Sequence, residues 1–198
     1  CRPVRKMIRE HKSNRKRVVV TGLGAMSPLG ESPESLWNGL VNGTSGNDKM
    51  KITDATEFPC KFSGEVLDFD PTAYMDRKEA RRMGRFSQLA VAAAQQALTH
   101  AELDLNNEDR ERIGVVLGNG SGGYPETEQA VRTLVGRGGM KINPFYLPTM
   151  LCNMAAANVS RLNGFYGYTN TIVTACAAGT PGIGEATEAI RRGAADVI

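Results

Sequence analysis

Short runs of aliphatic and β-branched residues alternate along the chain with longer stretches of helical periodicity. Residues 18–21, 113–118 and 169–174 are such runs, each followed by glycine or other small residues. This pattern predicts strands that are buried on both faces of a sheet. Residues 194–198 have the composition of a fourth such strand, and alternation over 61–66 predicts a short peripheral strand. Strands that alternate with helices favour a largely parallel sheet, so we expect an α/β fold.

Start and stop signals mark the first predicted helix. Ser32 followed by Pro33 is typical of a helix N-terminus, with serine as the cap and proline at the first helical position. Gly43 predicts the end of this helix. Other segments with helical spacing predict helices near 125–136, near 148–163, and from the small residues after 178 to Arg192.

The longest predicted helix lies between residues 76 and 100. Asp76 with Glu79 three positions later resembles a capping box. Apolar residues then recur at helical spacing up to His100, and many of them are alanines. A stripe of such small side chains predicts very close packing of this helix against a neighbouring segment.

Composition excludes several classes of protein. The chain has 198 residues, of which 41% are hydrophobic and 23% are charged, as in ordinary globular domains. No apolar run approaches the roughly 20 residues that span a bilayer, so a membrane-spanning protein is excluded. No membrane partner is expected either. Four widely spaced cysteines and two histidines favour neither a zinc site nor a disulfide framework. We therefore expect no metal, no cofactor and the reducing cytoplasm, with organellar import as a minor alternative.

The positive net charge comes from the N-terminus alone. Residues 1–17 carry eight basic side chains and one acidic one, which leaves 16 basic and 20 acidic side chains in the rest of the chain. Residues 1–16 are therefore interpreted as a basic, disordered tail, with a transit peptide as the alternative. The acidic body disfavours a nucleic-acid partner.

Two glycine-rich turns follow predicted strands. Residues 20–27 resemble a dinucleotide-binding turn, but Ser27 replaces the third glycine and no ribose-binding acid lies about 20 residues on. A structural tight turn is the favoured interpretation, and a nucleotide-dependent reductase is the alternative. The second turn contains Gly120, Ser121 and Gly122. It lacks the Gly-Lys-Ser/Thr of a phosphate-binding loop, so we expect it to pack closely or to form the wall of an apolar ligand site.

Cys176 stands between the strand predicted at 169–174 and a helix of very small residues. A free cysteine is usually buried and inert. In the first turn of a helix, however, unpaired N–H groups and the positive end of the helix dipole stabilise a thiolate. The same N–H groups can receive an oxyanion when the sulfur attacks a thioester. Cys176 is therefore a candidate nucleophile, whereas Cys60 and Cys152 are expected to be ordinary thiols.

Four motifs together resemble one family. They are Val-Val-Val-Thr-Gly-Leu-Gly-Ala-Met-Ser-Pro-Leu-Gly at 18–30, Gly-Asn-Gly-Ser-Gly-Gly at 118–123, Asn-Pro-Phe-Tyr-Leu-Pro at 143–148 and Thr-Ala-Cys-Ala-Ala-Gly-Thr at 174–180. In their order and spacing the chain resembles the β-ketoacyl-acyl carrier protein synthases, in particular the elongating synthase II type of fatty acid synthesis.

The resemblance implies a fold, a reaction and partners. The fold would be thiolase-like, the chain forming the N-terminal half of a layered αβαβα architecture that works as a homodimer. Cys176 would accept an acyl chain from acyl carrier protein, and malonyl-acyl carrier protein would then be decarboxylated and condensed with it. The implied substrate-binding residues are Gly120, Ser121, Gly122, Phe145 and Tyr146.

The family chain is about twice as long, and its second half supplies two histidines and a lysine. Residues 17–198 are therefore interpreted as a β-ketoacyl synthase N-terminal domain that is truncated at its C-terminal end and inactive alone. Alternatives are a polyketide-type ketosynthase and a chain-length-factor-like partner, although the latter would have lost the nucleophile. Ser121 stands where the elongating enzymes often place a bulky apolar residue, and Pro181 lies early in the helix that follows Cys176.

Overall fold

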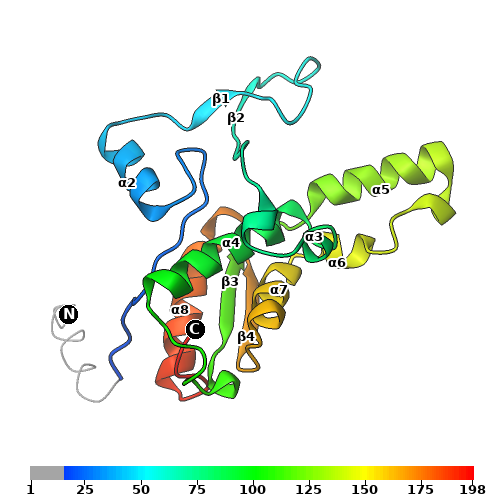
Figure 1. Ribbon diagram of the computed structural model, residues 1–198. Coiled ribbons are helices and arrows are strands. Elements are labelled where there is room, and N and C mark those ends of the chain that lie inside the picture. Colours follow the sequence, from blue (N-terminus) through cyan, green and yellow to red (C-terminus); the bar gives the residue numbers. More distant parts are fainter. Residues whose placement is uncertain (1–15) are drawn as a thin grey trace, which may run out of the picture.

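The centre of the protein is a pair of parallel strands between layers of helices (Figure 1). The computed structural model describes residues 16–198. Strand β3 (Val115–Asn119) pairs with β4 (Thr169–Val173), with Val115 opposite Thr169 and Asn119 opposite Val173. Val197 pairs with Ile113 in a single parallel bridge. The predicted strands at 113–118 and 169–174 are thus confirmed, as is their parallel arrangement. The expected basic tail lies, apart from Lys16, outside the described residues.

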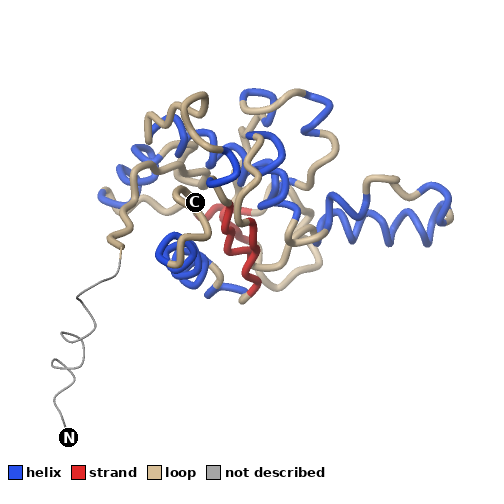
Figure 2. The backbone as a smooth tube through the Cα atoms, turned by 90° about the horizontal axis from the view of Figure 1, so that it is seen from below, coloured by secondary structure: helices blue, strands red, loops and turns tan. Residues whose placement is uncertain are grey.

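Helices cover both faces of this pair. Figures 1 and 2 show β3 and β4 between α8 (Gly179–Arg191) on one side and α4 (Arg85–His100) with α7 (Met154–Asn163) on the other. Alternate residues of β3 point to opposite layers. Val115 is buried in the main core, and Gly118 meets the start of α8. The main core is formed by Met75, Ala80, Met83, Val91, Ile113, Val115, Ala156, Val159 and Phe165.

Helix α2 (Pro33–Val41) begins and ends where the sequence predicts. The Ser32 hydroxyl accepts from the backbone N–H of Ser35, and the Ser35 hydroxyl accepts from the backbone N–H of Ser32, which forms a capping box. Gly43 then takes a φ of 66°, a left-handed conformation that glycine adopts readily. The short strand expected at 61–66 is confirmed as β2 (Phe62–Gly64), which pairs with an unpredicted antiparallel strand, β1 (Asn47–Lys49).

The long helix predicted from residue 76 is interrupted. Asp76 caps a short helix, α3 (Arg77–Ala80), and the chain turns before α4 begins at Arg85. Gly84 lies between them in an extended conformation, and a Cβ atom there would overlap with the carbonyl oxygen of Thr149. The prediction of a single helix was wrong: α3 ends at Ala80, and the extended backbone at Gly84, which packs against Thr149 in a contact that only glycine allows, separates it from α4.

The predicted strand at 18–21 is absent from the described residues. Val20 is 76% exposed, and this segment belongs to neither sheet, because the sheet that contains β3 and β4 consists of these two strands. The following residues cross α4 instead, so that a Cβ atom on Gly22 or Gly24 would overlap with the carbonyl oxygens of Ala97 and Ala93. The close packing expected of the alanine stripe is therefore confirmed, with this extended segment as the neighbour.

The remaining helices follow the predicted spacing. Helix α5 (Tyr124–Arg137) stands away from the body of the protein in Figure 1, and all its residues are at least partly exposed. The segment predicted near 148–163 forms two helices, α6 (Tyr146–Met150) and α7. Single 3-10 turns are η1 (Pro71–Ala73), η2 (Arg110–Arg112), η3 (Gly139–Lys141) and η4 (Ala175–Ala177). Among residues 16–198, no helix has the length and apolar character needed to cross a membrane.

Candidate active site

Strands β3 and β4 end side by side, because Asn119 and Val173 are their last residues and are paired. In open parallel sheets, ligands bind beyond the carboxyl ends of the strands. Two turns meet there. One is the glycine loop, residues 118–123, and the other is the nucleophile turn, residues 174–178, which contains Cys176. A Cβ atom on Gly120 would lie 4.0 Å from the carbonyl oxygen of Ala175, so the two turns are neighbours.

The nucleophile turn has a strained backbone. Ala175 has a φ of 49°, in the left-handed region that costs a residue with a Cβ atom about 1–2 kcal/mol. The N–H of Ala177 donates to the carbonyl oxygen of Thr174 at 3.1 Å, which closes the 3-10 turn η4. Cys176 is at the centre of this turn and is exposed. It lies just before α8 rather than inside its first turn, so the tight turn presents the thiol at the helix N-terminus.

Small residues let α8 begin directly against β3. A Cβ atom on Gly118 would overlap with the carbonyl oxygen of Ala178, and one on Gly182 would lie 3.2 Å from the Gly118 nitrogen. Pro181 is the third residue of α8, where the backbone nitrogen has no partner within the helix in any case. The helix therefore starts at Gly179 in spite of the proline, with its first N–H groups next to the nucleophile turn.

Side-chain and backbone hydrogen bonds hold the glycine loop. Asn119 donates through Nδ2 to the carbonyl oxygen of Cys152 at 2.7 Å and accepts from the Ser121 N–H through Oδ1 at 3.3 Å. Gly122 has a φ of 90°, and a Cβ atom on it would lie 2.9 Å from the carbonyl oxygen of Met150. Asn119 is not among the site residues expected from the sequence. The available signal was a side chain with both a donor and an acceptor at a strand end, followed by glycine.

Phe145 and Tyr146 lie in a different setting. The Arg82 guanidinium carbon is 5.0 Å from the centre of the Phe145 ring. The Tyr146 hydroxyl is 3.5 Å from Oγ1 of Thr127, and its side chain lines a cavity of about 490 Å³ beside α5. The structure thus brings Gly120 next to the nucleophile turn and places the two aromatic residues against α3 and α5. Their role in substrate binding stays a prediction.

A family model described as "Beta-ketoacyl synthase, N-terminal domain" matches residues 15–198. The chain belongs to the β-ketoacyl synthase family. Curated relatives named 3-oxoacyl-[acyl-carrier-protein] synthase 2 support this. The protein of Synechocystis sp. is 43% identical over 90% of this chain, and that of Vibrio harveyi is 41% identical over 93%. These matches cover 43% and 45% of the relatives, so the chain spans less than half of their length.

Solved ketosynthases share the fold. The ishigamide ketosynthase/chain length factor superposes with a TM-score of 0.84 at 28% identity, over 92% of this chain and 46% of that one. A ketosynthase solved in complex with its type II polyketide acyl-carrier protein has a TM-score of 0.78 at 29% identity, over 91% and 48%. The thiolase-like α/β fold expected for the N-terminal half is thereby confirmed.

The glycines at 22 and 24 have a structural role in this β-ketoacyl synthase domain. Both face the backbone of α4, which leaves no room for a pyrophosphate between them and the helix. The Leu23 N–H donates to Nδ1 of His100 and the Ala25 N–H to Oε1 of Gln96, each at 2.9 Å. This extended segment is thus tied to α4. The structural role expected of its glycines is confirmed, but residues 20–26 form no tight turn, and their contact with α4 disfavours the reductase alternative.

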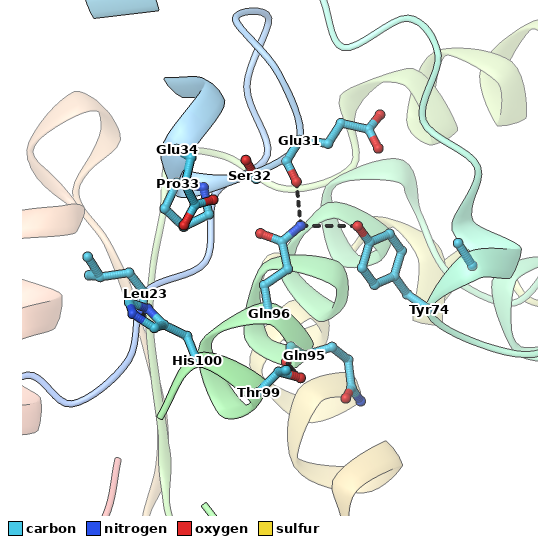
Figure 3. A pocket seen from close by; sticks show the side chains of 11 residues that line it. Leu23, Glu31, Ser32, Pro33, Glu34, Tyr74, Gln95, Gln96, Thr99 and His100 are labelled. Atoms are coloured by element: carbon cyan, nitrogen blue, oxygen red, sulfur yellow. Dashed lines mark hydrogen bonds between the residues drawn. The ribbon is translucent and has the colours of Figure 1, made fainter. Parts of the chain in front are cut away.

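Gln96 also borders a polar cavity next to this segment. Figure 3 shows its amide nitrogen donating to the backbone oxygen of Glu31 and to the Tyr74 hydroxyl, at 2.6 and 3.0 Å. The cavity has a volume of about 570 Å³ and includes Glu34 and His100. The pKa of Glu34 is lowered because its carboxylate accepts from its own backbone N–H and from Ser32, with a further contribution from His100.

The other described cysteines lack the setting of Cys176. Cys60 is exposed and donates through Sγ to the carbonyl oxygen of Phe62 at 3.3 Å. Cys152 is partly buried beneath the glycine loop, where its carbonyl oxygen accepts from Asn119. Exposure alone therefore does not distinguish Cys176 from Cys60, but position at a helix N-terminus does. Within residues 16–198, no three His, Cys, Asp or Glu side chains are grouped so that they could hold a metal ion.

Proposed function

We propose that the complete protein elongates acyl chains by decarboxylating Claisen condensation in fatty acid synthesis, with Cys176 as the acyl acceptor. The observation that carries the proposal is the exposed thiol on a strained turn between the end of β4 and the N-terminus of α8. Such a position offers the first N–H groups of α8 to an oxyanion that develops when the sulfur attacks a thioester. The homologous curated enzymes are named for the same reaction class.

The reaction has two stages. The Cys176 sulfur attacks the carbonyl carbon of an acyl thioester, a new carbon–sulfur bond forms, and the thiol of the carrier leaves with a proton. Malonyl-acyl carrier protein then loses carbon dioxide, and the electrons of the broken bond remain as an enolate. The enolate carbon attacks the acyl-Cys176 carbonyl, the carbon–sulfur bond breaks, and the β-ketoacyl product stays on the carrier. Positioned donors must stabilise the enolate.

Acyl carrier protein is the proposed partner. Four basic side chains of the α3 region, Arg77, Lys78, Arg81 and Arg82, border a cavity of about 400 Å³ together with Phe145. This surface is suited to an acidic carrier or to the phosphate of its prosthetic arm.

We also infer a homodimer, supported by the exposed apolar side chains of α5, among them Val135 at 83% exposure. The free cysteines in the described part of the chain agree with a reducing cytoplasm.

Product analysis of the complete protein tests this function. Supplied with acyl- and malonyl-carrier protein, it is expected to release carbon dioxide and to form a β-ketoacyl product two carbons longer than the acyl group. Mass spectrometry of the carrier-bound product separates this from the second candidate, a polyketide-type ketosynthase, which is favoured by the similarity to a ketosynthase solved with its type II polyketide acyl-carrier protein. Repeated rounds giving a poly-β-keto chain would support the second candidate, and acyl transfer without any carbon–carbon bond would contradict both.

A Ser121→Ile change is expected to shorten the longest acyl group that is accepted. Ser121 is exposed and follows Gly120, which faces the nucleophile turn, so we expect the added bulk of isoleucine to displace an equal volume of acyl chain, about two or three methylene groups. The measurement is kcat/KM over a series of acyl-carrier protein lengths. Ser121→Ala serves as the control and should keep the wild-type profile. Identical profiles for Ser121→Ile and the wild type would mean that the loop has a structural role only.

A further inference from the structure

Three backbone segments meet where the glycine loop ends. Gly123 closes the loop, Gly84 precedes α4, and Thr149 lies in α6. A Cβ atom on Gly84 would overlap with the Thr149 carbonyl oxygen, and one on Gly123 would lie 2.6 Å from the same atom. Neither glycine can therefore be replaced without moving a backbone segment. This meeting point of Gly84, Gly123 and Thr149 is called the glycine junction below.

One carboxylate reaches into the glycine junction. Glu126, in the first turn of α5, accepts the backbone N–H of Arg85 through Oε1 at 3.1 Å. It thereby caps α4, whose own N-cap residue, Gly84, supplies no side chain. Its two oxygens also cover the two glycines, because a Cβ atom on Gly84 would lie 3.0 Å from Oε1 and one on Gly123 2.8 Å from Oε2.

The second oxygen of this carboxylate is unusual. Oε2 of Glu126 is buried and has no hydrogen-bond partner among the described residues. A carboxylate oxygen that is buried without a hydrogen-bond partner destabilises the fold. Stability alone would therefore favour an arrangement in which both oxygens of Glu126 accept hydrogen bonds. The Glu126 side chain instead fills the space between Gly84 and Gly123, which indicates that its size and shape are needed there to keep the two backbone segments in position.

The glycine junction is joined to the nucleophile turn through the glycine loop. At one end, the Gly123 N–H donates to the carbonyl oxygen of Met150 at 2.9 Å, next to the junction. At the other end, Gly120 faces Ala175 in the nucleophile turn. We propose that Glu126 is a positioning residue. It fixes the position of the glycine loop, and this position limits the length of the acyl chain that Cys176 can carry. This inference rests on the proposed function and adds to it a determinant of acyl-length specificity.

The test compares Glu126→Ala, Glu126→Gln and Glu128→Ala in the complete protein. Glu128 lies two residues further along α5, where it is exposed and pairs with Arg132, so it is the matched control. The first readout is the ratio of kcat/KM for a long and a short acyl-carrier protein, which a uniform loss of folded protein does not change. The second readout is hydrogen exchange at the Arg85 amide.

Glu126→Ala is expected to change the specificity ratio by about threefold or more and to speed exchange at Arg85, because the N–H of Arg85 loses its acceptor. Glu126→Gln should keep the wild-type ratio, since its amide oxygen can accept the same N–H, and Glu128→Ala should change neither readout. If Glu126→Ala does not fold, Glu126→Asp, which withdraws the carboxylate by one methylene, must shift the ratio instead.

A wild-type ratio in every folded Glu126 variant would overturn the inference, and so would a shift in Glu126→Gln as large as in Glu126→Ala. Failure of the proposed function itself can be distinguished from failure of the inference about Glu126. In that case the wild-type protein forms no β-ketoacyl product at all, while exchange at Arg85 still reports whether Glu126 caps α4.

Discussion

A Cys176→Ala variant of the complete protein is expected to lose condensation activity by about a thousandfold or more. No acyl-enzyme can form without the sulfur, and the two-stage route through the thioester is then closed. The fold should be unaffected, because Cys176 is exposed and alanine suits its place between Ala175 and Ala177. The measurement is the rate of β-ketoacyl product formation beside a thermal unfolding curve.

Cys60→Ala is the matched control for this variant. Cys60 is also an exposed free thiol, but it lies near β2, far along the chain from the strand ends that carry the site. Its replacement should leave the rate of condensation within about twofold of the wild type, as for most surface changes. Wild-type rates in Cys176→Ala would show that the thiol takes no part in the reaction.

The second large effect is expected for Gly118→Ala. The added methyl group would overlap with the carbonyl oxygen of Ala178, so β3 and the start of α8 must separate. Overpacking of this kind costs about 3 kcal/mol, and here it also displaces the nucleophile turn. We expect both a lower free energy of unfolding and a loss of condensation activity in the protein that remains folded.

Gly136→Ala is the control for this change. Gly136 is in α5, and a Cβ atom there meets nothing within 4 Å. Alanine is the better helix former by about 1 kcal/mol, so this variant should be as stable as the wild type or more so. Equal denaturant midpoints for Gly118→Ala and Gly136→Ala would contradict the close contact between β3 and α8.

The parts of the fold that the sequence predicts well are those with local signals. Ser32 and Pro33 mark the start of α2, and apolar runs mark β3 and β4, since capping and burial depend on neighbouring residues. The break at Gly84 depends on Thr149, and the unpaired segment at 18–21 depends on α4. Neither neighbour is visible in the local pattern, because long-range backbone contacts override periodicity.

The residues of the candidate site also divide into those that local sequence signals indicate and those that only the structure reveals. Cys176 was found from its place between a strand and a helix of small residues. The left-handed conformation of Ala175 was not, because alanine does not signal a positive φ as glycine does. The roles of Asn119 and Glu126 also required the structure, since both act on residues more than 30 positions away.

The central claim, that Cys176 is the acyl acceptor, is tested most directly by locating the acyl group. The complete protein is incubated with acyl-carrier protein in the absence of malonyl-carrier protein, digested, and analysed by mass spectrometry. The peptide that contains Cys176 is expected to carry the mass of one acyl group, which hydroxylamine removes as it does from a thioester. An acyl group on Cys60 or Cys152, or an unmodified Cys176 peptide under conditions in which condensation proceeds, would contradict the claim.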